Sequence, residues 1–207
     1  MLGVWLAQSV MTMFSRRPDA DIAEALAHAD RALAIAPDNP VIMSAASLPH
    51  RLFGNAALAL DLAQRANAAG GGDALFGARF GGNGLWASLI QAGREEEAIE
   101  GMLASRPPPE QILSVAYAAL GRWDEALMWA QRATATYPNS FLAWANLANA
   151  LAALDRLDEA RDAMRRVTAM VPTFTLAYYD KGARLGWRNR EKIVESQLAG
   201  LRRLEAP

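Results

Sequence analysis

Hydrophobic and small residues recur every three to four positions along most of the chain, with charged residues between them. That period is typical of amphipathic α-helices. In "LGRWDEALMWAQRATATYP", residues 120–138, the apolar positions Trp129, Ala130 and Ala133 continue this spacing behind Asp124 and Glu125. The pattern predicts an all-α protein.

A small residue recurs at one position of the pattern and divides the chain into units. Its positions are Ala25, Ala59, Ala98, Ala126 and Ala160, at spacings of 34, 39, 28 and 34 residues. Two antiparallel helices approach closely only where a side chain is small, and larger apolar residues fill the groove alongside. We therefore expect stacked helix pairs, because one pair cannot cover its own apolar face.

Gly121 and the two carboxylates beside it have two interpretations, a catalytic rim or a turn between helices. Glycine recurs at the matching positions 54 and 93, and acidic residues follow again at 95–96 and 158–159. Carboxylates in the first turn of a helix face the positive end of its macrodipole. The recurrence favours the turn.

The unit "FLAWANLANALAALDRLDEARDAMRRVTAMVP" resembles the tetratricopeptide repeat: Trp144 and Leu147 are large, Ala148 and Ala160 small, and Pro172 ends the unit. The resemblance implies an α-solenoid, a right-handed superhelix of antiparallel helix pairs. Across the chain it implies one array, with repeats near 2–39, 40–73, 79–106, 107–140 and 141–174 and capping helices at 175–204. The cap is expected to place one face on the stack and the other in water.

Three places break the pattern. The glycine-rich connection 67–84 follows no strand pattern, so a loosened inter-repeat link is favoured over a phosphate-binding loop. Pro49 is expected to kink or shorten its helix, because proline lacks an N–H. Another helix is expected to be shortened before Pro107–Pro109, and Pro109 is expected at the first position of the next helix.

Composition narrows the chemistry. The 207 residues are 52% hydrophobic and 21% charged, with net charge −1 and no cysteine, which fits a cytoplasmic protein that does not bind nucleic acid. The opening run "MLGVWLAQSVMTMF" is shorter than the ~20 apolar residues of a membrane span, so we expect a buried helix. His28 and His50 lie on different repeats, no catalytic motif appears, and we expect neither an enzyme nor a metal or cofactor.

The tetratricopeptide resemblance implies that first helices line a concave groove. We call the residues expected to line it the groove set. By repeat position it comprises Gln111, Val115, Ala119, Leu142, Ala145, Asn149, Ala152, Tyr179 and Trp187. This implies a non-catalytic scaffold that binds a protein or peptide there. Asn149 is the one match to the family's Lys/Asn/Arg carboxylate clamp, and it is expected either to bond a peptide backbone or to face water.

The last third of the chain, through the terminal "LAGLRRLEAP", is similar to repeat regions that end some bacterial class III adenylate cyclases and winged-helix transcriptional regulators. This resemblance implies an alternative function, as the regulatory or sensory part of such a protein. A further hypothesis is a homo-oligomer formed through an uncapped end of the array.

Overall fold

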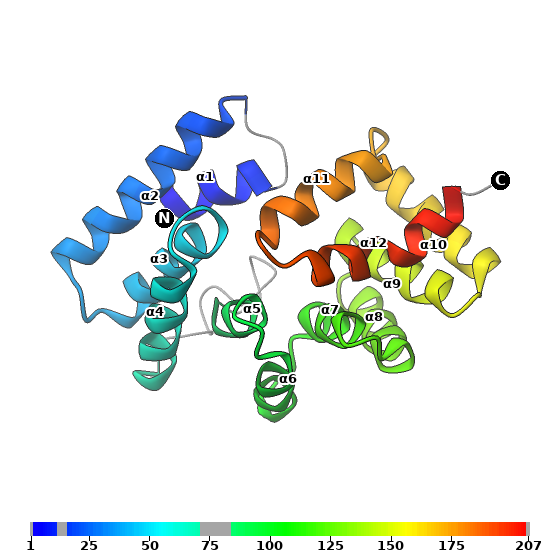
Figure 1. Ribbon diagram of the computed structural model, residues 1–207, viewed down its shortest axis with the longest axis horizontal. Helices are drawn as coiled ribbons and strands as arrows, with labels where there is room; N and C mark the ends of the chain where they lie inside the picture. The colour runs from blue at the N-terminus through cyan, green and yellow to red at the C-terminus, as the bar shows by residue number, and fades with distance from the viewer. Residues whose placement is uncertain (1, 12–15, 71–83, 206–207) are drawn as a thin grey trace. The chain divides into compact units, whose positions relative to one another are not determined.

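Helix pairs in sequential order make up the described part of the chain, in a computed structural model that describes residues 2–11, 16–70 and 84–205 (Figure 1). Within these residues there are twelve helices and no strand. The chain divides into two compact units, residues 1–98 and 99–207. The all-α, tetratricopeptide-like prediction is confirmed.

Unit 1 places each helix against the next one along the chain. α1 packs on α2, α2 on α3, α3 on α4 and α4 on α5, and α3 also meets α1 and α5. The bounds are α1 Leu2–Met11, α2 Pro18–Ile35, α3 Pro40–Phe53, α4 Ala56–Ala68 and α5 Gly84–Gln91. The next helix, α6 Glu95–Ala104, runs across the division between the units.

Unit 2 begins with the same sequential order. α7 packs on α8, α8 on α9 and α9 on α10, and the first helices α7 and α9 also touch. The bounds are α7 Glu110–Ala119, α8 Trp123–Thr136, α9 Phe141–Ala153, α10 Leu157–Met170, α11 Leu176–Gly186 and α12 Glu191–Glu205.

The small residues that mark the repeat lie at the centres of these contacts. Ala25, Ala59, Ala98, Ala126 and Ala160 each have 0% of their surface exposed. The larger apolar residues around them are buried as well, with Leu113 at 0% and Leu147 at 8%. This is the packing predicted from helix pairs that approach where a side chain is small.

Ala160→Leu is expected to destabilise unit 2, because the added methylenes have no space between α9 and α10. Overpacking of this kind costs about 1–3 kcal/mol. The measurement is urea unfolding of the full chain, with Ala177→Leu as the control, since Ala177 is exposed on α11. Equal midpoints for both variants would contradict the packing role of Ala160.

The turn between the helices of a pair has a repeated backbone geometry. Gly93 and Gly121 have φ of 81° and 74°, and the equivalent Asp155 has φ of 64°. An L-residue in this left-handed region is strained, which explains glycine at two of the three positions. Gly54 differs: its φ is −113°, and an added Cβ would lie 2.9 Å from both His50 Nδ1 and Leu26 Cδ2.

An arginine after each left-handed residue pairs with a glutamate three residues on, joining Arg94 to Glu97, Arg122 to Glu125 and Arg156 to Glu159. The arginine hydrogen bond lowers the pKa of the Glu125 and Glu159 carboxyls. The acidic residues lie in the first turns of α6, α8 and α10, as predicted. The charged cluster near Gly121 is therefore a turn.

Gly121→Ala is expected to destabilise unit 2 by about 1 kcal/mol, because an L-residue costs about 1–2 kcal/mol in the left-handed region. No atom lies within 4 Å of an added Cβ, so the cost is conformational and not steric. Gly121→Asn is the matched control, since asparagine tolerates this region. Thermal unfolding of the two variants and the parent decides, and a neutral Gly121→Ala would refute the argument.

Two sequence expectations need correction or fall outside the structure. Pro49 does not shorten α3, which continues to Phe53, where the Gly54 N–H caps the His50 carbonyl at 3.0 Å. The missing N–H affects one bond near the end of the helix, and Pro49 is fully buried by its neighbours. Of the glycine-rich connection 67–84, residues 71–83 lie outside the described residues. The Pro107–Pro109 segment separates α6 from α7, and Pro109 precedes the first residue of α7.

Candidate functional site

The groove set lies on three first helices of unit 2. Gln111, Val115 and Ala119 are on α7, and Tyr179 is on α11, with Trp187 directly after it. The set continues on α9 with Leu142, Ala145, Asn149 and Ala152. Most of these side chains are buried in the folded chain; Gln111 and Leu142 are half-buried.

The protein's own last helix covers part of this face. α12 packs against α9 and α7, and also against α11 (Figure 1). Both α7 and α9 are first helices of their pairs, so α12 lies along the side of the repeats that the sequence assigned to a partner. The face between α7 and α9 is therefore occupied by a helix.

Asn149 is the polar centre of this contact. Its Nδ2 donates to the Ser196 carbonyl oxygen at 2.8 Å, and its Oδ1 accepts from the Gly200 N–H at 2.8 Å. The residue is 4% exposed. Asn149 therefore bonds the backbone of α12, a partner that the sequence did not indicate, and its bonding to a peptide backbone stays a prediction.

Gly200 lets α12 approach this close. An added Cβ would overlap the Asn149 carbonyl oxygen and lie 2.9 Å from its carbonyl carbon and from Oδ1. Backbone in this position cannot retreat as the tip of a flexible side chain could. A glycine in the middle of a helix normally costs stability, so close approach is the reason for it here.

Arg203 bonds the C-terminal end of α9. Its guanidinium donates to the Ala152 carbonyl oxygen at 2.7 Å and to Asp155 Oδ1 at 2.5 Å. The last carbonyls of a helix lack intrahelical donors and carry the negative end of its dipole, so a cation is favoured there. The adjacent Arg202 pairs instead with Glu195 within α12.

Tyr179 is held in place by burial and by a hydrogen bond. It is 6% exposed, its hydroxyl donates to Asn146 Oδ1 at 3.3 Å, and its ring centroid lies 5.8 Å from that of Phe174. Burial raises the pKa of the Tyr179 hydroxyl well above its ordinary value. Trp187, which caps α11, is 8% exposed.

The sequence predicted α12 as the second helix of a cap, and that role stays a prediction. Its apolar stripe was identified correctly: Ile193, Val194, Leu198 and Leu201 are 0 to 3% exposed. The stripe packs on α9 and α7, where Gly200 lies close to Asn149. Gly200, Ser196 and Arg203 were not identified from the sequence, although glycine inside an amphipathic helix is a signal of close backbone approach.

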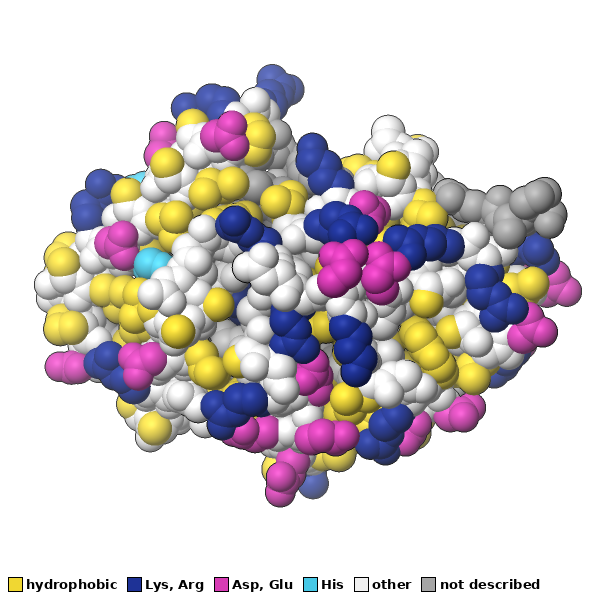
Figure 2. Space-filling view, in the orientation of Figure 1, with side chains coloured by type: hydrophobic (Ala, Val, Ile, Leu, Met, Phe, Trp, Pro, Cys, Tyr) yellow, Lys and Arg dark blue, Asp and Glu magenta, His cyan; other side chains and the backbone are white. Residues whose placement is uncertain are grey.

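Charges over α11 and α12 are mixed in sign, as Figure 2 shows. Arg184 bonds Asp180 and Glu191, and its Nη2 lies 3.5 Å from Glu195 Oε1. The hydrogen bond from Arg202 lowers the pKa of Glu195. These pairs link α11 to α12 and alternate the two signs of charge over these helices.

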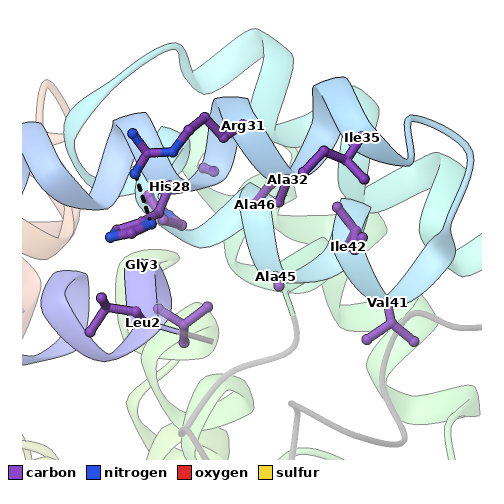
Figure 3. A pocket seen from close by; sticks show the side chains of 13 residues that line it. Leu2, Gly3, His28, Arg31, Ala32, Ile35, Val41, Ile42, Ala45 and Ala46 are labelled. Atoms are coloured by element: carbon purple, nitrogen blue, oxygen red, sulfur yellow. Dashed lines mark hydrogen bonds between the residues drawn. The ribbon is translucent and has the colours of Figure 1, made fainter.

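Unit 1 has a separate hollow of about 480 Å³ between α1, α2 and α3 (Figure 3). Its walls are apolar, and Leu2, Ile35 and Val41 on its lining are 52%, 83% and 36% exposed. At its edge Arg31 lies 3.0 Å from His28 Nδ1. The opening run, expected to be a buried helix, is buried at Val4, Leu6 and Ala7 but exposed at Leu2 and Trp5. Self-association through an end of the array stays a prediction.

No metal site is formed by the described residues, since no three His, Cys, Asp or Glu side chains gather there. His50 is buried, with its Nε2 3.2 Å from Asp30 Oδ1. Among the helices in the described ranges, none is long and apolar enough to cross a membrane.

Comparison with protein families matches residues 113–184 to the family described as tetratricopeptide repeat. The matched segment runs from α7 into α11 and so includes the face that α12 covers. The matched segment is similar to tetratricopeptide repeats, which are generally protein–protein interaction modules, and the comparison identifies no catalytic domain. No curated protein matches the sequence, and the resemblance to cyclase and regulator repeats gains no support.

Proposed function

We propose that this protein is a non-catalytic scaffold that binds a peptide or a partner domain through the concave face formed by α7 and α9. The observation that carries the proposal is that the segment matched to the tetratricopeptide repeat has a face that accommodates a helix. The small side chains of Ala145 and Ala152, both 0% exposed, leave room for close contact with a neighbouring backbone.

The chemistry of this face supports binding and not catalysis. Asn149 uses its amide in two backbone hydrogen bonds, as a recognition residue does. The Tyr179 hydroxyl is buried and donates a hydrogen bond to Asn146 Oδ1 within the protein. What this surface can supply is apolar area and backbone recognition.

Site-specific photo-crosslinking in the native cells tests this function. A photoreactive residue replaces Leu142, which is half-buried on the groove face, or Met128, which is 43% exposed on α8. We expect a discrete crosslinked partner from position 142 and none from position 128. Partners that crosslink from position 128 alone would assign binding to another surface and refute the proposal.

A further inference from the structure

The occupant of the groove is an amphipathic helix. Ile193 and Leu198 of α12 are fully buried, whereas Lys192, Ala199 and Arg202 are exposed. The face between α7 and α9 therefore takes up one apolar side of a helix and leaves the other side in solvent. The apolar area of such a surface contributes binding affinity. It does not by itself fix the position of the ligand helix along the groove.

Register comes from the polar contacts. Asn149 bonds two backbone groups of α12 that are four residues apart, Ser196 and Gly200, so it reads the helix at the one point where its backbone comes closest. Arg203 is three residues after Gly200 and lies on the same side of the helix. Together they specify a glycine against Asn149 and an arginine one turn later.

The groove also has the charge to match that arginine. Asp155 is 76% exposed at the side chain and lies beside the last carbonyls of α9, a site that favours a cation through both the carboxylate and the helix dipole. The Arg203 side chain is itself 44% exposed, so water screens the pair. This end of the contact can exchange one cation for another at little cost.

We propose that α12 occupies the groove as an internal competitor, and that the external ligand is an amphipathic helix of a partner protein with the same features: one apolar stripe, a glycine facing Asn149 and an arginine or lysine facing Asp155. The inference rests on the proposed function and names the partner's chemistry. Binding requires α12 to leave. The apparent affinity of the chain is therefore the affinity of the open groove multiplied by the fraction of time that the groove is open.

A partner helix is favoured over α12 of a second copy. Exchange of α12 between two copies replaces each contact by an identical one, so it gains no contact energy and loses the freedom of one molecule. A foreign helix can add apolar contacts that α12 does not make. It can therefore displace α12 at a lower concentration than a helix with the sequence of α12 requires.

The test uses a fluorescent peptide with the sequence of residues 188–205 and the full chain with either Arg203→Ala or Arg202→Ala. Arg203→Ala removes contacts between α12 and α9 and frees the groove more often, whereas Arg202→Ala removes a pair within α12. We expect the peptide to bind the Arg203→Ala chain about tenfold more tightly than the parent chain, and the Arg202→Ala chain within about twofold of the parent. Hydrogen exchange of α12 amides should rise as the peptide binds.

Two further variants keep the inference falsifiable. Gly200→Ala in the full chain opens the groove by steric overlap and should also strengthen peptide binding, whereas a peptide with leucine in place of Gly200 should not bind. Equal peptide affinity of the Arg203→Ala, Gly200→Ala and parent chains, or saturation by the peptide while α12 amides stay protected, would overturn the inference. Dimers of Arg203→Ala in light scattering without peptide would overturn the choice of a foreign partner. A partner still crosslinked from position 142 in these cases would leave the scaffold function intact.

Discussion

Leu198→Ala is expected to lower the free energy of unfolding of unit 2 by about 2–5 kcal/mol, the usual cost of a cavity left by a buried leucine. Leu198 is 0% exposed and lies on the stripe of α12 that packs against α9 and α7. If α12 is part of the core of unit 2, the loss appears in the cooperative unfolding of the whole unit. Denaturant unfolding followed by far-ultraviolet circular dichroism measures it.

Leu103→Ala is the matched control for this prediction. The same chemical change is made on α6, where Leu103 is 41% exposed, so the expected change is within about 0.5 kcal/mol. A loss at Leu198 no greater than the loss at Leu103 would mean that α12 does not stabilise the unit. The groove would then be open in solution.

Asn149→Ala is expected to destabilise the contact between α9 and α12 by about 0.5–1.5 kcal/mol for each hydrogen bond lost. The substitution removes the Asn149 bonds to the Gly200 N–H and to the Ser196 carbonyl oxygen, two groups that lie four residues apart in α12. Hydrogen exchange resolved to α12 measures the effect, because α12 opens more often when its contact with α9 is weaker.

Asn139→Ala serves as the control, since Asn139 is an exposed asparagine in the turn before α9 and is expected to leave α12 exchange unchanged. The pattern of exchange matters as much as the size of the effect. Faster exchange spread evenly over α7 to α12 would indicate general destabilisation. Faster exchange concentrated in α12 is the result expected from a helix that Asn149 holds in place.

Much of the fold was predictable from local pattern, as Ala126 and Gly121 show. Ala126 marks a place where two neighbouring helices touch, and Gly121 marks a left-handed turn a few residues away. Both requirements depend on residues close in the chain, so they recur with the repeat. Pro49 does not end α3, and the burial that surrounds it comes from packing and not from its sequence neighbours.

The candidate site was predictable only in part. Repeat position placed Asn149 on a first helix, and the structure shows it bonding the backbone of α12, which the sequence did not indicate. The identity of that backbone depends on Gly200, which lies 51 residues further along the chain from Asn149. No local pattern links two residues so far apart.

The sequence by itself determined that this chain forms antiparallel helix pairs and that its last helix has one apolar side. Those properties follow from side-chain size and helical period, which act over a few turns. The tertiary structure alone decided what that apolar side covers, because the stripe of α12 is compatible with the end of the repeats or with the face between α7 and α9. Close approach of Gly200 to Asn149, and the reach of Arg203 to the end of α9, favour the second position.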